Sequence, residues 1–269
     1  MASKAKQFDI RRQYGFTAIA IACFVALYVP IIVLVVFAFS AGENVSVWGG
    51  FTFDWFKRAA QNQQVINATV LSFKIAISAA VLSTIAATMA ALATTRTEPY
   101  RGLTAKYAFI NLPLMIPEIV TAVALLIFFS RIKVWTGYSG IGYLIAAHTA
   151  FCLPFAYLPI RARLEGMDLT LERAAADLYA SPWNAFRYVT LPLLWPGIIA
   201  GLMLAFVISL DDVVITNFVK SGGQDTLPTY MLGQIRRSIT PEINAISAAL
   251  FLISVLIVTG FFFMTRKKD

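Results

Sequence analysis

The sequence predicts an all-α membrane protein that crosses the bilayer six times. Of its 269 residues, 59% are hydrophobic and only 13% are charged, and the mean hydropathy is +0.73. Such a composition is typical of a polytopic membrane protein. Six apolar stretches reach about 20 residues, the length that a helix needs to cross the hydrocarbon core. The predicted spans are near Gly15–Phe39, Thr69–Thr94, Tyr107–Phe129, Ile141–Ile160, Leu191–Leu210 and Ala245–Thr265.

The first two predicted spans carry different signals. Gly15–Phe39 is much longer than the roughly 7–15 apolar residues of a secretory signal peptide, so we expect the protein to retain it. Thr69–Thr94 repeats small residues every four positions in two rows, which are Ser72, Ala76, Ala80, Thr84 and Thr88, and Ala79, Ser83, Ala87 and Ala91. Because small residues let helix backbones approach closely in lipid, this span predicts a tight helix–helix contact rather than a ligand groove.

Prolines interrupt the third and fourth predicted spans, at Pro113, Pro117 and Pro154. Such breaks are tolerated where neighbouring protein or water satisfies the freed backbone groups, so they suggest a pathway. The third span also contains Glu118, eleven residues from its predicted start and about 16 Å along a helix. An ionisable group at that depth is costly unless it is paired or hydrated. Glu118 therefore either lines a pathway or pairs with a basic residue of a neighbouring helix.

A polar loop, residues 161–190, separates the fourth and fifth predicted spans. Asp168 or Thr170 can cap a helix there, because their side-chain oxygens reach the free N–H groups of a first turn. An apolar stripe follows at helical spacing, formed by Leu171, Ala174, Ala175 and Leu178. Ser181 and Pro182 then suit a second helix start. We expect two short helices with a break between them, held outside the bilayer where they can contact a partner.

Two adjacent aspartates, Asp211 and Asp212, end the fifth predicted span. They lie at the outer interface if the span is Leu191–Leu210, and they are buried if it starts nearer Gly197. One interpretation is an acidic lining for a cationic solute, and the other is that they cap a membrane helix. Together with Glu118 they are the predicted residues of a substrate pathway.

Lysine and arginine residues are distributed unequally between the two sides of the six predicted spans. One side carries fourteen: Lys4, Lys6, Arg11, Arg12, Arg96, Arg101, Lys106, Arg161, Arg163, Arg173, Arg187, Arg266, Lys267 and Lys268. The other side carries seven: Lys57, Arg58, Arg131, Lys133, Lys220, Arg236 and Arg237. Because basic residues concentrate in cytoplasmic segments, both termini and the 161–190 loop are predicted to be cytoplasmic.

The residues give little support to catalysis. The one histidine, His148, lies on an apolar helix, where a histidine is usually a hydrogen-bonded packing residue. Cys23 and Cys152 lie in apolar segments, and no Cys/His cluster has the spacing of a metal site. Asp211 and Asp212 diverge by about 100° on a helix, so they cannot share one substrate as an aspartyl protease pair does. Without a GxxxxGK[ST] motif the chain is not expected to bind nucleotide.

Several motifs resemble those of ABC-importer permeases. Residues 172–192 read ERAAADLYASPWNAFRYVTLP, similar to the cytoplasmic loop motif E-A-A-x-x-x-G followed by nine residues and I-x-L-P. Four further blocks resemble the C-type permease of the spermidine/putrescine importers: MIPEIV at 115–120, AHTAFCLPF at 147–155, SLDDVVITNFV at 209–219 and TPEINAIS at 240–247. The loop motif is specific for ABC importers in general, whereas the other blocks indicate polyamines.

This resemblance implies a type I importer permease fold over one domain, residues 1–269, with the coupling helix of the 161–190 loop between helices 4 and 5. It implies a bacterial inner-membrane complex with a homologous but different permease, two cytoplasmic ATPase subunits and an external polyamine-binding protein. ATP and Mg²⁺ would sit on the ATPase subunits, with no cofactor in this chain. The implied ATPase-docking residues are Asp168, Glu172, Arg173, Ala174, Ala175, Asp177, Leu178, Tyr179 and Ala180.

The loop departs from the family pattern at two positions. Arg173 stands where the family has its glutamate, although Glu172 is adjacent, and Tyr179 stands where the family turns with glycine. Two other functions stay open from the sequence. The same kind of importer could carry ferric ion, an opine or an organophosphonate, or the chain could be a non-transporting membrane scaffold whose loop docks a cytosolic protein.

Overall fold

The structure, a computed structural model, describes residues 14–45, 47–96, 101–237 and 240–265, and these are almost entirely helical. In chain order the helices are α1 (Tyr14–Phe37), α2 (Asp54–Gln61), α3 (Gln63–Thr95), α4 (Leu103–Met115), α5 (Glu118–Thr136), α6 (Gly142–Glu165), α7 (Thr170–Asp177), α8 (Pro182–Ala185), a π-helical turn (Phe186–Thr190), α9 (Leu191–Asp211), α10 (Val214–Val219), α11 (Leu227–Arg237) and α12 (Pro241–Thr265).

Six helical segments of this described part are long and apolar enough to cross a membrane, which confirms the predicted number. They are Gly15–Phe37, Gln63–Thr95, Glu118–Thr136, Gly142–Glu165, Pro182–Asp211 and Pro241–Gly260. Of the basic residues that predict the orientation, Lys4, Lys6, Arg11, Arg12, Arg266, Lys267 and Lys268 lie outside the described residues.

The third predicted span, Tyr107–Phe129, is wrong in its bounds. The chain forms two helices, α4 and α5, which are separated by an extended Ile116 (φ −90°, ψ 137°) and by Pro117. A proline disfavours helical backbone in the residue before it, and it has no N–H with which to continue the hydrogen-bond ladder. Glu118 is therefore the first residue of α5 rather than an interior position of a long helix.

The second short helix of the 161–190 loop is continuous with a membrane segment, contrary to the prediction of a separate helix. α8 passes through the π-helical turn Phe186–Thr190 directly into α9, and Thr190 keeps helical dihedrals. The apolar helical segment consequently runs from Pro182 to Asp211 instead of starting at Leu191. α8 and α9 therefore form one continuous helical segment.

The chain divides into two compact units, and the larger comprises residues 62–236 and 253–269. Its core is made by α3, α6 and α9, which pack against one another. The two predicted rows of small residues on α3 form this contact, because all of them except Thr88 are buried. On α9 a methyl group at Gly201 would lie 2.7 Å from the Ala156 carbonyl oxygen of α6, so the crossing requires glycine.

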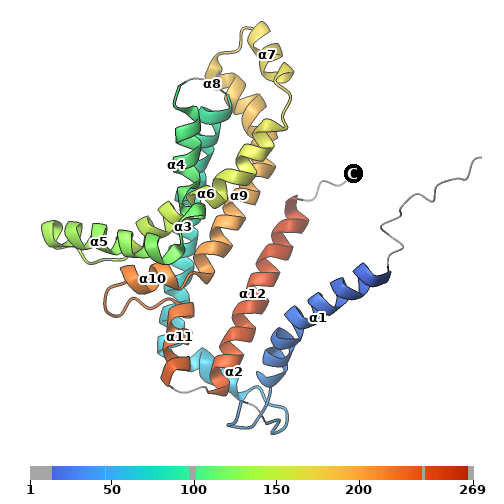
Figure 1. Cartoon of the computed structure of the whole chain (residues 1–269), viewed down its shortest axis with the longest axis vertical. Helices are drawn as coiled ribbons and strands as arrows, with labels where there is room; N and C mark the ends of the chain where they lie inside the picture. The colour runs from blue at the N-terminus through green and yellow to red at the C-terminus, as the bar shows by residue number, and fades with distance from the viewer. Residues whose placement is uncertain (1–13, 46, 97–100, 238–239, 266–269) are drawn as a thin grey trace, which may run out of the picture. The chain divides into compact units, whose positions relative to one another are not determined.

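Four shorter helices lie outside this three-helix core in Figure 1. The helices α7 and α8 lie together at one end of the unit, α5 extends sideways, and α10 lies close to the start of α5. α10 packs against both α5 and α6. The two regions with predicted functional residues, the 161–190 loop and the end of α9, are thereby held on one core.

The smaller unit comprises residues 1–61 and 237–252. Its described core contains the buried residues Ala38, Ala245 and Ala248, against which Trp55 and Phe56 pack. The Trp55 indole Nε1 donates a hydrogen bond of 2.8 Å to the carbonyl oxygen of Ser40. Most side chains of α1 are exposed, as expected for a helix whose apolar surface faces lipid or another membrane subunit.

Candidate functional site

A buried polar cluster joins α6, the end of α9 and α10. Asp212 is 6% exposed, and its carboxylate oxygens accept hydrogen bonds from the Ile215 N–H (3.1 Å), the Thr216 N–H (2.9 Å) and the Thr216 hydroxyl (2.9 Å). These bonds satisfy two N–H groups of the first turn of α10, so Asp212 caps that helix. Of the two interpretations of Asp212, its hydrogen bonds match that of a helix cap.

His148 of α6 completes this cluster. Its Nδ1 lies 2.8 Å from the Ser209 hydroxyl, its Nε2 lies 3.0 Å from the Thr216 hydroxyl, and Nε2 is 3.4 Å from an Asp212 oxygen. Both ring nitrogens are therefore hydrogen-bonded within the protein, which confirms the prediction of a packing histidine. Each polar group that is withdrawn from water here has a partner, as a low-dielectric site requires.

The other two predicted acids differ from Asp212 in their exposure. Asp211, the last residue of α9, is exposed, and Glu118 is half-buried at the start of α5. The Glu118 side chain reaches the Asp212 carboxyl group, so the break at Pro117 brings the third-span acid to the end of the fifth span. Two carboxyl groups at short range repel when both are ionised, and a cation beside them relieves that repulsion. Such a pair of carboxyl groups either shares one proton or holds a cation beside it.

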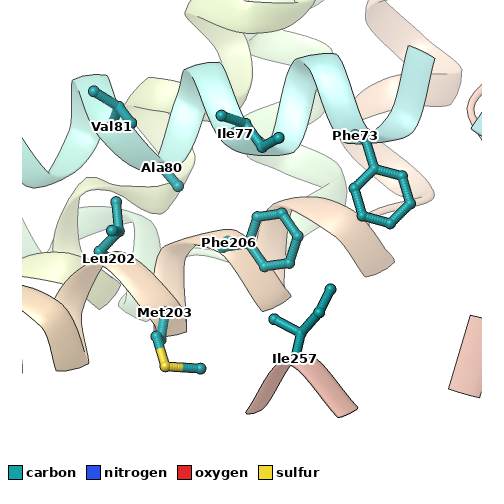
Figure 2. Close-up of a pocket in the computed structure, with 8 residues that line it drawn as sticks. All are labelled: Phe73, Ile77, Ala80, Val81, Leu202, Met203, Phe206 and Ile257. Carbon is teal, nitrogen blue, oxygen red and sulfur yellow. The ribbon is translucent and has the colours of Figure 1, made fainter. Parts of the chain in front are cut away.

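The cavity drawn in Figure 2 has a different character. Its volume is about 340 Å³, and α3, α9 and α12 line it with apolar side chains such as Phe73, Ile77, Phe206 and Ile257. Such walls offer no hydrogen-bond acceptor to an ammonium group. The cavity therefore lacks the ligands that a cation site needs.

Local hydrogen bonds fix both helix starts of the 161–190 loop. An Asp168 carboxylate oxygen accepts the Thr170 N–H at 2.9 Å, and this bond holds the pKa of Asp168 below its usual value. The Ser181 hydroxyl accepts the Asn184 N–H at 3.3 Å, with Pro182 at the first helical position. Of the two predicted caps for α7, Asp168 acts and Thr170 lies inside the helix.

The end of α7 forms a Schellman turn. The Tyr179 N–H donates to the Ala176 carbonyl (2.9 Å), and the Ala180 N–H donates to the Ala175 carbonyl (3.0 Å). This double closure places Tyr179 in the left-handed region, with φ 59°. The position of the family's glycine thus has the backbone conformation that glycine adopts at no steric cost, but it holds a tyrosine.

An exposed apolar surface covers the outside of this loop. Leu178 is 82% exposed, Tyr179 is 96% exposed and Trp183 is 64% exposed, and no residue of α7 is buried. Arg173, Ala174 and Asp177 are exposed as well, whereas Ala175 and Ala180 are half-buried. Large apolar side chains that stay this exposed at a polar loop are typical of a protein–protein contact surface.

Glu172 points in the opposite direction, toward the membrane helices. One of its carboxylate oxygens lies 3.3 Å from Arg96 Nε and accepts the Thr190 hydroxyl at 3.0 Å. Arg96 ends α3, and Thr190 is the last residue of the π-helical turn before α9. Both ionic side chains are largely shielded from solvent, so this pair is stronger than an open surface pair. A single carboxylate therefore ties α7 to the end of α3 and to the π-helical turn that leads into α9.

The chain has relatives of known function along most of its length. The sequence pattern of the family described as "Binding-protein-dependent transport system inner membrane component" matches residues 104–267. This chain belongs to that family. The spermidine/putrescine transport system permease protein PotC of Haemophilus influenzae is 35% identical over 263 residues, which cover 98% of this chain and 99% of PotC. The putrescine transport system permease protein PotI of Escherichia coli K12 is 34% identical over 88% of this chain and 85% of PotI.

Solved structures agree with this permease family in fold. A chain of a bacterial ABC transporter that imports alginate superposes with a TM-score of 0.72 at 20% identity, covering 97% of this chain and 98% of its own length. A chain of the MetNI methionine ABC transporter gives a TM-score of 0.65 at 17% identity, covering 75% of this chain and 94% of its own length. The predicted type I importer permease fold is thus confirmed.

The permease sequence revealed only part of these two regions. The sequence pattern indicates the three acids and the loop residues. It does not indicate Arg96 and Thr190 as partners of Glu172, or Ser209 and Thr216 as partners of His148. Ser209 and Thr216 carry a weak signal, because both flank the two aspartates within the block 209–219. Arg96 carries none, since a basic residue at the end of a membrane span is ordinary.

Proposed function

We propose that this chain is a membrane-spanning permease subunit of an ATP-driven importer for polyamines such as spermidine and putrescine. The observation that carries the proposal is the similarity to PotC over almost the full length of both chains. The fold supports the importer class, and the acids near the end of α9 support a cationic solute. Residues 1–269 act as one permease domain in this proposal.

The substrate pathway in this proposal runs past the acidic group of Asp211, Asp212 and Glu118. Asp211 is exposed and Glu118 is half-buried, so these two offer carboxylate oxygens to a passing ammonium group. Asp212 is buried beside them and contributes negative charge, while its oxygens accept the hydrogen bonds that cap α10. Each acid should bind the cation only weakly, because conduction requires release as well as entry.

The 161–190 loop transmits the work of ATP hydrolysis in this proposal. Its exposed face, with Leu178 at the centre, docks on a cytoplasmic ATPase subunit. Closure of the ATPase pair displaces α7, and the Glu172 contacts pass this movement to α3 and α9. The continuous segment from Pro182 to Asp211 then carries it toward the acidic group.

The remaining subunits follow from the same proposal. A homologous but different permease forms the second half of the pathway, two ATPase subunits bind the loops, and an external binding protein delivers the polyamine. The amino and carboxyl termini are cytoplasmic, on the side of the 161–190 loop. ATP and Mg²⁺ bind the ATPase subunits.

Co-purification and turnover test this assembly. The chain is expressed with its sister permease and ATPase, reconstituted in nanodiscs, and assayed for ATP hydrolysis with and without binding protein loaded with spermidine. We expect the ATPase to co-purify and its turnover to rise with the loaded protein. A stable complex whose turnover ignores the loaded protein would contradict the importer and favour a scaffold.

A further inference from the structure

We infer that Tyr179 is the aromatic anchor by which this permease recognises its own ATPase subunit, an inference that rests on the docking role proposed for the 161–190 loop. Among the described residues, Tyr179 is the only non-glycine residue with positive φ. A tyrosine in the left-handed region is strained, because its Cβ approaches the following carbonyl oxygen. The hydrogen bonds of the turn hold this backbone conformation, but the ring itself gains no packing within the described structure, since the side chain is 96% exposed.

The Schellman turn explains how the ring is presented. The two hydrogen bonds that close α7 fix the backbone of Tyr179 whatever its side chain is. With the backbone fixed, the ring projects from the corner of the loop instead of folding onto α7. A rigid, exposed tyrosine costs little conformational entropy on binding, which is why tyrosine is common among the residues that dominate protein interfaces.

The location of Tyr179 matches an ATPase subunit as the occupant better than lipid. Tyr179 lies between α7 and α8, the part of the larger unit that Figure 1 places beyond the ends of α3, α4 and α9. Its neighbour Leu178 is also exposed, and Trp183 continues the same exposed surface on α8. Tyrosines that anchor proteins in a bilayer sit level with the headgroups, whereas α8 and the π-helical turn Phe186–Thr190 separate Tyr179 from α9.

Four variants of the full chain, each assembled with the sister permease, separate the ring from the backbone. Tyr179→Gly and Tyr179→Asn both accept the left-handed conformation but remove the ring, whereas Tyr179→Phe keeps the ring. Leu178→Asp places a charge in the exposed face and tests docking itself. The readout is the Kd of the purified ATPase for each permease pair, measured in nanodiscs and in detergent.

We expect Tyr179→Gly and Tyr179→Asn to weaken ATPase binding about tenfold or more, the scale of an interface anchor. Their thermal midpoints should be no lower than that of the parent, because the strain is removed. Tyr179→Phe keeps the ring, so the Kd of its ATPase complex should lie within about threefold of the parent's. A loss that appears in both nanodiscs and detergent supports contact with the ATPase.

Three outcomes overturn the inference. If Tyr179→Gly and Tyr179→Asn bind normally while Leu178→Asp does not, the loop docks the ATPase but Tyr179 is no anchor. If Leu178→Asp also binds normally, the docking role proposed for the 161–190 loop is wrong as well. If the loss of affinity appears only in nanodiscs, the ring contacts lipid instead of the ATPase.

Discussion

Asp212 and Asp211 are neighbours in sequence with different surroundings. The Asp212 carboxylate is buried and accepts three hydrogen bonds, whereas Asp211 is exposed at the last position of α9. The divergence arises because α9 stops at Asp211 and Asp212 takes an extended conformation, with ψ 131°. One residue thus builds the turn into α10, and the other remains available to a ligand.

Substitution of Asp212 should therefore act on stability. Asp212→Asn keeps the shape but loses one acceptor oxygen, so a buried donor among Ile215, Thr216 and His148 is left without its partner. We expect a loss of about 1–3 kcal/mol in the free energy of unfolding, the cost of one unsatisfied buried group. The measurement is thermal unfolding in detergent, with Asp211→Asn as the matched control. Equal stability of both variants would contradict this role of Asp212.

Removing the charge of Asp211 or Glu118 should instead slow transport. Asp211→Asn and Glu118→Gln preserve size, and both remove a carboxylate from the proposed pathway. We expect slower spermidine uptake with normal expression and unchanged affinity of the external binding protein. Asp225→Asn is the control, because the Asp225 carboxylate is paired with Lys220, whose Nζ lies 2.7 Å from it. Uptake at the parental rate in both test variants would refute the acidic lining.

Residue-level features were predictable where their causes are local. Asp168 and Ser181 could be recognised as caps because each bonds an N–H two or three residues ahead. The partners of Glu172 could not be recognised, because Arg96 reaches it from another membrane helix and only tertiary packing brings them together. The same holds for His148 with Ser209 and Thr216.

The 161–190 loop acts as one element with two faces. Its outer face presents Leu178 and Tyr179, and its inner face holds Glu172 against Arg96 and Thr190. A loop that bound the ATPase without this inner contact would move independently of α3. The proposal thus assigns docking to the side chains that follow the end of α7, and transmission to Glu172 inside that helix.

Loss of the contact between Glu172 and Arg96 should uncouple ATP hydrolysis from spermidine uptake. Glu172→Gln removes the charge that faces Arg96 while it leaves the exposed face unchanged. We expect the ATPase to remain bound and to hydrolyse ATP, with spermidine uptake reduced several-fold per ATP hydrolysed. The measurement is the ratio of uptake to hydrolysis in proteoliposomes.

The control for Glu172 is Glu165→Gln. Glu165 also pairs with an arginine, since Arg161 Nε lies 2.7 Å from its carboxylate, but both residues belong to α6. Its removal breaks an ion pair without freeing α7. If the two variants show the same ratio of uptake to hydrolysis, Glu172 does not transmit the movement.

Element boundaries were harder to predict than element number. Six apolar runs sufficed for six spans, because length and hydropathy decide membrane crossing. The break at Pro117 was visible as a proline, but whether a proline kinks or ends a membrane helix depends on its neighbours. The π-helical turn that joins α8 to α9 has no sequence signature of its own, so the loop appeared to end earlier.

At the scale of the whole molecule, the permease has surfaces that a single chain does not cover. Phe24 and Leu27 on α1 and Ile127 on α5 are 59%, 67% and 60% exposed. Lipid and a second permease subunit both match such faces, because neither requires hydrogen bonds from them. The proposed heteromeric assembly supplies both environments.

ATP-driven uptake of labelled spermidine into proteoliposomes tests the central claim most directly. The vesicles contain this chain with its sister permease and ATPase, ATP is placed on the ATPase side, and loaded binding protein is placed on the other. We predict accumulation that requires ATP and binding protein and that putrescine reduces, whereas a ferric salt, an opine or an organophosphonate does not. Accumulation of one of those solutes without any transport of spermidine would contradict the assignment.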